Sequence, residues 1–129
     1  MLTVSSPLEG LRILVLEDQV IVALSMRDML LDLGATVVGP ALTLADGHEL
    51  ARDAAIDCAV LDLWIHGERS YAIGEALRRR NIPFAMTGVV DSGTEPPGFA
   101  AIPRLLKPFA ADDLTGALLA ALRQPGLTG

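Results

Sequence analysis

Short apolar runs alternate along this chain with longer stretches whose apolar residues recur every three or four positions. The short runs are predicted to be buried strands, because a strand covered on both faces is apolar throughout. The longer stretches are typical of amphipathic helices. The predicted strands are residues 11–16, 35–38, 57–61, 82–86 and 102–106, and the predicted helices are residues 18–33, 42–54, 70–80 and 110–123.

Capping and turn residues divide these elements. Asp18 is predicted to stand at the N-terminus of the first helix, Gly39-Pro40 to end the second strand, and Ser70 to cap the third helix. Residues 64–69 are predicted to be a loop with Gly67 at its tip.

The stretch between the last two strands, residues 91–103, holds three prolines and two glycines. A proline lacks the N–H of a helix and restrains the residue before it, so only a loop or one short turn is expected there. The expected fold is an α/β, flavodoxin-like, doubly wound sheet of five parallel strands in the order 2-1-3-4-5. Helices are expected on both faces, with the fourth helix short or absent. The domain is expected at residues 11–123, between an N-terminal extension (1–10) and a C-terminal tail (124–129), with no output domain.

The composition suits one compact domain, since 51% of the 129 residues are hydrophobic. A net charge of −6 argues against a dedicated nucleic-acid binder, and the basic cluster Arg78-Arg79-Arg80 is predicted to be a solvated helix end. The single cysteine, Cys58, excludes an internal disulfide. The sequence has no run of 18 apolar residues and no signal peptide, so no membrane span and a cytoplasmic location are expected.

Every predicted strand except the second carries a polar residue at its carboxyl end. Glu17 and Asp18 follow the first strand, Asp62 the third, Thr87 the fourth and Lys107 the fifth. In a doubly wound sheet the carboxyl ends of the strands meet at one edge, where ligands bind. Each residue alone is more often a turn or cap residue, but the set together indicates a functional site.

Three carboxylates crowded at one edge repel each other, and a hard divalent cation relieves that repulsion. Mg²⁺ takes oxygen ligands, keeps several waters and commonly shares a phosphate oxygen. Asp18 and Asp62 are the expected direct ligands, and Glu17 is expected to act through water. The backbone carbonyl of Trp64 is expected to complete the protein's share of the ligands.

The same residues fit phosphoryl transfer, which needs an in-line nucleophile and neutralisation of the phosphoryl oxygens. Asp62 supplies a nucleophilic carboxylate, Lys107 a positive charge and Thr87 a hydroxyl donor. A flavin-binding enzyme of flavodoxin type is disfavoured, because Glu17-Asp18 stand where a phosphate-binding loop needs glycines and hydroxyls.

Four short segments resemble the response-regulator receiver domains of two-component systems. They are residues 13–18 (ILVLED), 60–63 (VLDL), 86–88 (MTG) and 106–109 (LKPF), and the likeness covers residues 11–122. The resemblance implies that Asp62 is the phosphoacceptor and that Glu17 and Asp18 form an acidic magnesium pocket. It also implies that Thr87 is the switch hydroxyl and that Lys107 contacts the phosphate.

Residues 67–71 (GERSY) and 81–88 (NIPFAMTG) resemble more closely the stand-alone receivers of alphaproteobacteria whose fourth strand ends in a Phe-Ala-Thr-Gly-type motif. Such proteins often have a degenerate fourth helix and are associated with stress and envelope signalling. Arg104 departs from the pattern, since most receivers place Tyr or Phe three residues before the lysine. The usual aromatic switch therefore cannot operate here in its ordinary form.

The resemblance implies phosphorelay signalling. A histidine kinase or a histidine phosphotransfer protein is expected to phosphorylate Asp62. The domain is not a conventional enzyme, but it is expected to catalyse this step and a slow dephosphorylation. Output is expected through a partner protein, a homodimer or onward phosphotransfer, without direct binding of nucleic acid. The alternative is a phosphorylation-independent pseudo-receiver acting as a protein interaction module, which Arg104 and the irregular residues 91–103 favour.

Overall fold

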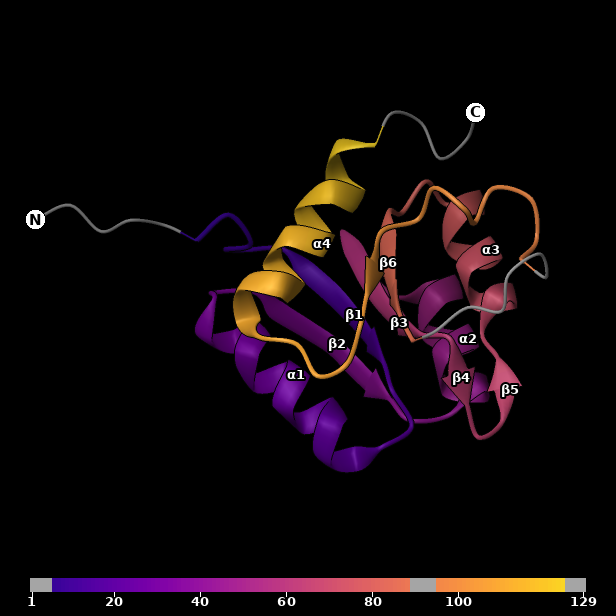
Figure 1. Ribbon diagram of the computed structural model, residues 1–129, viewed down its shortest axis with the longest axis horizontal. Helices are drawn as coiled ribbons and strands as arrows, with labels where there is room; N and C mark the ends of the chain where they lie inside the picture. Colours follow the sequence, from indigo (N-terminus) through magenta and orange to yellow (C-terminus); the bar gives the residue numbers. More distant parts are fainter. Residues whose placement is uncertain (1–5, 89–94, 125–129) are drawn as a thin grey trace, which may run out of the picture.

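The computed structural model describes residues 6–88 and 95–124. Within these residues the chain forms a five-stranded sheet, a separate two-stranded hairpin and four helices (Figure 1). None of these four helices has the length and apolar character that crossing a membrane requires. The sheet strands are β1 (Arg12–Leu16), β2 (Thr36–Ala41), β3 (Cys58–Asp62), β6 (Phe84–Thr87) and β7 (Arg104–Leu105). The hairpin strands are β4 (Trp64–Ile65) and β5 (Glu68–Arg69), and the helices are α1 (Val20–Asp32), α2 (Leu44–Asp53), α3 (Tyr71–Arg79) and α4 (Ala111–Arg123).

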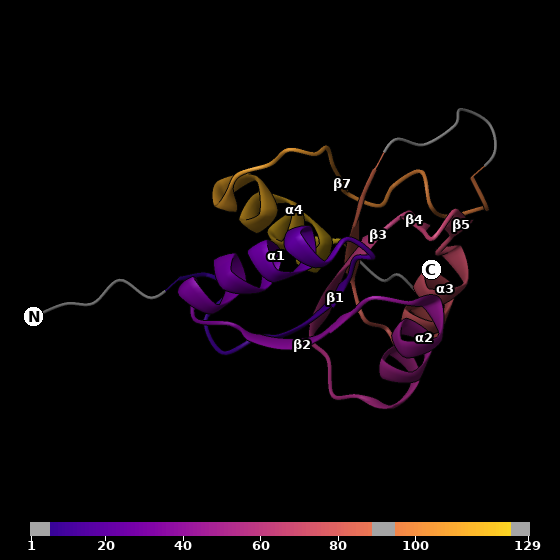
Figure 2. The same ribbon diagram turned by 90° about the horizontal axis from the view of Figure 1, so that it is seen from below.

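The sheet strands follow the order β2-β1-β3-β6-β7, and every neighbouring pair is parallel. Counted along the chain, this is the predicted order 2-1-3-4-5. Helices α1 and α4 lie on one face of the sheet and α2 and α3 on the other (Figure 2). The prediction of a flavodoxin-like, doubly wound fold is therefore confirmed.

Two apolar layers, one on each face of the sheet, hold the helices in place. Successive residues of a strand point to opposite faces, so Leu14 and Leu16 of β1 join one layer while Ile13 and Val15 join the other. The first layer packs against α2 and α3, and the second packs against α1 and α4. Cys58 is fully buried in the second layer, and this burial raises the pKa of its thiol to about 12.

The second strand runs farther than predicted. β2 continues through Gly39 and Pro40 to Ala41, so the prediction that Gly39-Pro40 ends it is wrong. β2 is an edge strand, where a proline's missing N–H need not interrupt pairing. The pairing with β1 shifts between Leu14 and Leu16, and Gly39 adopts a φ of 97° at this bulge. A Cβ on Gly39 would lie 2.6 Å from the Ala41 nitrogen, so the bulge requires glycine.

The first helix begins two residues later than predicted. Its first residue is Val20 and its N-cap is Gln19, so Asp18 does not stand at the helix N-terminus. The Asp18 carboxylate instead accepts a hydrogen bond from the backbone N–H of His66, at 2.9 Å. A contact distant in sequence thus keeps Asp18 in the connection between β1 and α1.

Residues 64–69, predicted as a loop, form the antiparallel β4–β5 hairpin. His66 and Gly67 occupy its turn with φ values of 50° and 79°. Positive φ at both central residues is the signature of a type I′ turn, whose twist suits a two-residue hairpin. Gly67 is therefore at the tip, as predicted, but the flanking residues are paired.

The described part of the segment between β6 and β7, residues 95–103, contains no helix, as its prolines predicted. Residues 91–94 of the predicted loop lie outside the described residues. Phe99 anchors the segment, because its fully buried ring lies 4.9 Å from the Tyr71 ring and 6.0 Å from the Phe84 ring, centre to centre.

The described part of the expected N-terminal extension packs on the domain. Leu8 is fully buried in the layer beneath α1 and α4. The N–H of Gly10 donates to the carbonyl of Gly34 at 2.9 Å. Residues 6–10 therefore contribute to the core that residues 11–123 form.

Candidate functional site

Three carboxylates meet at the carboxyl ends of β1 and β3. Glu17 and Asp18 follow the last residue of β1, and Asp62 is the last residue of β3. One carboxylate oxygen of each residue lies within 4.8 Å of the other two. Glu17 and Asp62 are buried, whereas the Asp18 side chain remains 21% exposed. The three acids that were predicted to meet at the strand ends, Glu17, Asp18 and Asp62, therefore do lie together.

Glu17 is held by hydrogen bonds to its backbone and to its side chain. Its N–H donates to the carbonyl of Ala41, at 3.0 Å, which the extension of β2 through the bulge makes available. Its Oε2 accepts a hydrogen bond from the N–H of Gln19, also at 3.0 Å. Burial raises the pKa of Glu17, and the hydrogen bonds from Lys107 and Gln19 oppose that rise only in part.

Lys107, the single lysine of the chain, reaches the cluster from the loop after β7. Its Nζ lies 2.5 Å from Oε1 of Glu17 and 3.0 Å from Oδ2 of Asp62. Partial burial favours the neutral amine, but the two carboxylates outweigh this and raise the pKa of Lys107. The ammonium is therefore a bridge between two acids that repel each other.

Asp18 is held from the hairpin side. Partial burial, the largest single influence, opposes its ionisation, but the hydrogen bonds from the His66 N–H and from Glu17 and the charge of His66 together outweigh it, and the pKa of Asp18 is lowered. The His66 ring lies 4.0 Å from Oδ2 of Asp18, and its Nε2 is 3.1 Å from the carbonyl of Leu42. Asp18 is thus kept ionised at the rim of the cluster.

Thr87 ends β6 directly beside the phosphoacceptor candidate, since it is paired with Asp62 across the sheet. The residue is fully buried, and its hydroxyl has no hydrogen-bond partner among the described residues. The next residue, Gly88, has a φ of 106°, and a Cβ there would lie 3.6 Å from Oδ1 of Asp62. A buried hydroxyl without a partner beside the Asp62 carboxylate is suited to a ligand oxygen.

Two contacts of the segment after Asp62 were not predicted. The N–H of Trp64 donates to Oδ1 of Asp62 at 3.3 Å, and the Ser70 hydroxyl donates to the Asp62 carbonyl at 2.6 Å. Ser70 does occupy the N-cap position of α3, as predicted, but its side chain makes no capping hydrogen bond. In the sequence, only a spacing of eight residues relates Ser70 to Asp62. That spacing does not show whether the Ser70 hydroxyl caps α3 or binds the Asp62 carbonyl.

Comparison with protein-family models and with curated proteins gives no match. Solved structures do match. SdrG from Sphingomonas melonis Fr1 is 35% identical with a TM-score of 0.76, and the match covers 88% of this chain and 97% of SdrG. A BeF3-activated conformation of SdrG from Pseudomonas melonis Fr1 is 36% identical with a TM-score of 0.71, covering 88% and 98%. A response regulator receiver protein from Sinorhizobium medicae WSM419 is 25% identical with a TM-score of 0.72, covering 89% and 96%. This chain belongs to the response-regulator receiver family.

The general function of this receiver is therefore response regulation. Its strand-end cluster offers oxygen donors from Glu17, Asp18 and Asp62 on one side, and an ammonium and an unpaired hydroxyl on the other. Oxygen-only ligands suit a hard cation such as Mg²⁺, and the donors from Lys107 and Thr87 suit an anion. The residues present thus fit a cation and a phosphoryl group side by side.

Arg104 occupies the position at which most receivers have an aromatic residue. Its guanidinium pairs with the Glu95 carboxylate, lies 3.4 Å from the carbonyl of Phe99 and contacts the sulfur of Met86 at 3.7 Å. Desolvation by its surroundings lowers the pKa of Arg104. In this receiver the position ties β7 to residues 95–99.

Proposed function

We propose that this receiver accepts a phosphoryl group on Asp62 from a histidine kinase or a histidine phosphotransfer protein. The observation that carries the proposal is the Lys107 ammonium, 3.0 Å from Oδ2 of Asp62 in a buried acidic cluster. In the reaction, an Asp62 oxygen forms a bond to phosphorus while the bond from phosphorus to the donor's imidazole nitrogen breaks. The electron pair stays on the imidazole, which then takes up a proton.

Asp18 and Asp62 are the proposed direct ligands of Mg²⁺, with Glu17 acting through water and the Trp64 carbonyl completing the set. The mutual approach of the three carboxylates supports this assignment. The bound ion supplies positive charge that offsets the phosphoryl oxygens and the crowded acids. The lowered pKa of Asp18, to which the hydrogen bond from the His66 N–H contributes, favours the carboxylate that this role requires.

Lys107 and Thr87 stabilise the remaining phosphoryl oxygens. Lys107 already lies at the Asp62 carboxylate, and the Thr87 hydroxyl donates to a second oxygen once one is present. Thr87 ends β6 and Lys107 lies in the loop after β7, so their movement toward the phosphoryl group shifts the population of conformations on the β6–β7 side of the sheet. Phosphorylation and slow dephosphorylation are both catalysed by the domain itself.

Small phosphodonors test the acceptor directly. Incubation with phosphoramidate and Mg²⁺ is expected to raise the intact mass of the protein by one phosphoryl group, and Asp62→Asn is expected to abolish the rise. Asp53→Asn, which alters an exposed carboxylate paired with Arg52 on α2, is the matched control and should behave as wild type. An unchanged wild-type mass with several donors, or full labelling of Asp62→Asn, would contradict the proposal.

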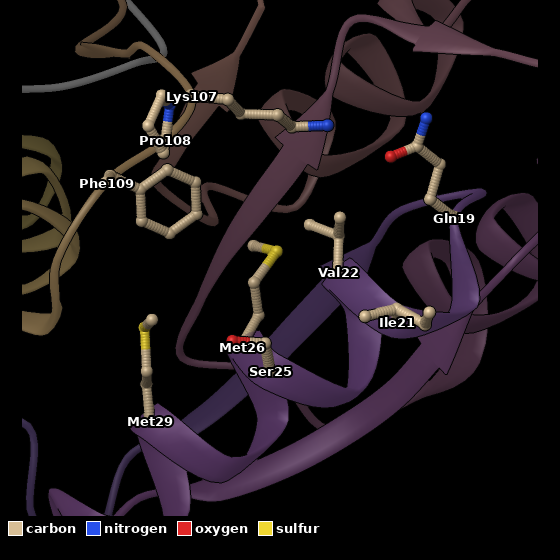
Figure 3. Close-up of a pocket in the computed structure, with 9 residues that line it drawn as sticks. All are labelled: Gln19, Ile21, Val22, Ser25, Met26, Met29, Lys107, Pro108 and Phe109. Atoms are coloured by element: carbon tan, nitrogen blue, oxygen red, sulfur yellow. The ribbon is translucent and has the colours of Figure 1, made fainter.

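The phosphodonor protein is proposed to dock beside α1. A groove of about 440 Å³ runs between this helix and the loop after β7, and it begins at Lys107. Figure 3 shows Val22 and Met26 of α1 facing Pro108 and Phe109 across it. Ile21, which also lines the groove, is 84% exposed, so an apolar surface adjoins the acceptor site. A histidine that reaches Asp62 must be carried by a protein that covers this region.

A phosphorylation-independent interaction module is the second candidate function, and the Arg104 contacts favour it. An arginine paired with Glu95 cannot make the rotamer change of an aromatic switch residue. This candidate predicts that Asp62→Asn binds its partner as wild type does, whereas the phosphorelay predicts that phosphorylation changes the affinity. Partner affinity measured with and without BeF3⁻ and Mg²⁺ separates the two.

A further inference from the structure

The Ser70 hydroxyl points at the backbone of the acceptor aspartate. Serine at a helix N-cap ordinarily accepts a hydrogen bond from an N–H of the first helical turn. Ser70 stands at that position but is buried to 1% exposure, and its hydroxyl donates to the carbonyl of Asp62 at 2.6 Å. Its own N–H donates to the carbonyl of Leu63 at 2.9 Å. Both hydrogen-bond donors of Ser70 are thus bound to backbone carbonyls at the end of β3 and in the residue that follows it.

These two hydrogen bonds close the base of the β4–β5 hairpin. Within that closed segment, the N–H of Trp64 reaches Oδ1 of Asp62 at 3.3 Å, and the N–H of His66 reaches Oδ2 of Asp18 at 2.9 Å. The hairpin therefore delivers backbone donors to two of the three clustered carboxylates. Its placement depends on how its two ends are joined, which is where Ser70 acts.

We infer that Ser70 is a positioning residue for the acceptor site, holding the Asp62 carboxylate and the hairpin donors in the geometry that metal binding and phosphorylation require. Ser70 does not touch a reacting atom, and it acts through the Asp62 peptide and the hairpin. The expected effect of Ser70 on the phosphorylation rate rests on the proposed function, whereas its expected effect on the hairpin amides does not.

A purely structural helix-start residue is the competing explanation, and Arg80 at the other end of α3 provides the control. Arg80 donates to the carbonyls of Ala51 and Ala54 at 2.7 and 2.8 Å, at the end of α2 that leads into the start of β3. Arg80→Met therefore removes hydrogen bonds of the same helix at the opposite edge of the sheet. It lowers stability without touching the acceptor site.

Ser70→Ala and Arg80→Met are compared under conditions where both are folded, as judged by urea titration. In the metal-free protein, hydrogen exchange at the Trp64 and His66 amides is expected to be faster by about tenfold in Ser70→Ala only. Calorimetry is expected to show the Kd for Mg²⁺ raised by about tenfold, since partners that orient a ligand carry effects of that size. Phosphorylation by phosphoramidate at saturating Mg²⁺ is expected to slow by about tenfold.

Ser70→Thr, which keeps the hydroxyl, is expected to restore amide protection and Mg²⁺ affinity. If Ser70→Ala does not fold, Ser70→Cys takes its place with the same expectations, because a thiol is a weak donor. The inference would be overturned if Ser70→Ala and Arg80→Met had the same amide exchange at Trp64 and His66, the same Mg²⁺ affinity and the same phosphorylation rate. A wild-type protein that is not phosphorylated at all would overturn the proposed function, while the exchange comparison would still decide the role of Ser70.

Discussion

The ammonium of Lys107 stands where three acids converge, and it determines how they behave without metal. It lies 2.5 Å from Glu17 and 3.0 Å from Asp62, so it compensates two carboxylates that are both buried. Burial still raises the pKa of Glu17 despite this partner. The protonation of Glu17 therefore couples the stability of the domain to pH.

Lys107→Met is expected to make that coupling stronger. Without the ammonium, the folded-state pKa of Glu17 moves further above its ordinary 4.5. The folded protein then holds a proton that the unfolded chain has released, so the free energy of unfolding falls as the pH rises from about 4.5. We expect the variant to be less stable than wild type by about 1–3 kcal/mol at pH 7 in EDTA.

Urea titrations at pH 4.5 and pH 7 measure this difference, which should shrink at the lower pH. Added Mg²⁺ at pH 7 should also reduce it, since a cation replaces the missing charge. A difference that is the same at both pH values would show that Lys107 acts through packing rather than through charge.

At the scale of elements, the end of α3 fastens two neighbouring segments. Arg80 caps α2 through the carbonyls of Ala51 and Ala54, and Arg78 donates to the carbonyl of Pro97 at 3.3 Å. The prediction that these arginines form a solvated helix end fits Arg79, which is exposed. It does not account for the hydrogen bonds that Arg78 and Arg80 make. The arginines join α3 to α2 and to residues 95–99.

Arg80→Met is expected to lower the free energy of unfolding by about 1–2 kcal/mol, because two carbonyls lose a charged donor at the end of α2. Arg79→Met removes the same charge one residue earlier and is expected to change stability by no more than about 0.5 kcal/mol. Urea unfolding of the two variants side by side is the measurement. Equal losses would assign the effect to net charge or helix dipole rather than to the capping contacts.

At the scale of the whole molecule, the site opens beside an exposed apolar helix face. Val20 and Ile21 of α1 are 52% and 84% exposed, while Leu31 near the other end of the helix is 50% exposed. Under the proposed docking, a phosphodonor protein covers α1, whereas phosphoramidate is small enough to react without covering it. Docking and chemistry are therefore separable on this surface.

Ile21→Glu is expected to slow phosphotransfer from the cognate kinase or phosphotransfer protein by about tenfold or more, as loss of an exposed anchor does in a protein interface. Its reaction with phosphoramidate should stay within about twofold of wild type, because the Asp62 cluster is intact. Leu31→Glu places the same charge ten residues along the helix and should affect neither reaction. Equal slowing with both donors would show that Ile21 acts on the chemistry and not on docking.

The sequence predicted the whole-molecule architecture because apolar periodicity identifies each strand and helix from neighbouring residues. Alternating strands and helices of this kind pack as a doubly wound sheet. Glu17, Asp62 and Lys107 could be placed together since the strands of such a sheet end at one edge. What it could not predict are roles set by distant partners. The Ser70 hydroxyl donates to the Asp62 carbonyl and does not cap its own helix. Asp18 accepts a hydrogen bond from the His66 N–H and does not stand at the start of α1. The predicted strand order already placed the second strand at the edge of the sheet, but local sequence does not show that this strand continues through Pro40.

The unsatisfied hydroxyl of Thr87 has a thermodynamic implication for signalling. A buried polar group that lacks a partner costs about 1–3 kcal/mol, and the Thr87 hydroxyl has no partner among the described residues. If Asp62 is phosphorylated as proposed, a phosphoryl oxygen would accept from this hydroxyl, and this contact would favour the modified form by roughly a factor of ten, since 1.4 kcal/mol corresponds to tenfold. The Thr87 contact would then be a stabilising interaction of the phosphorylated form that the unmodified domain lacks.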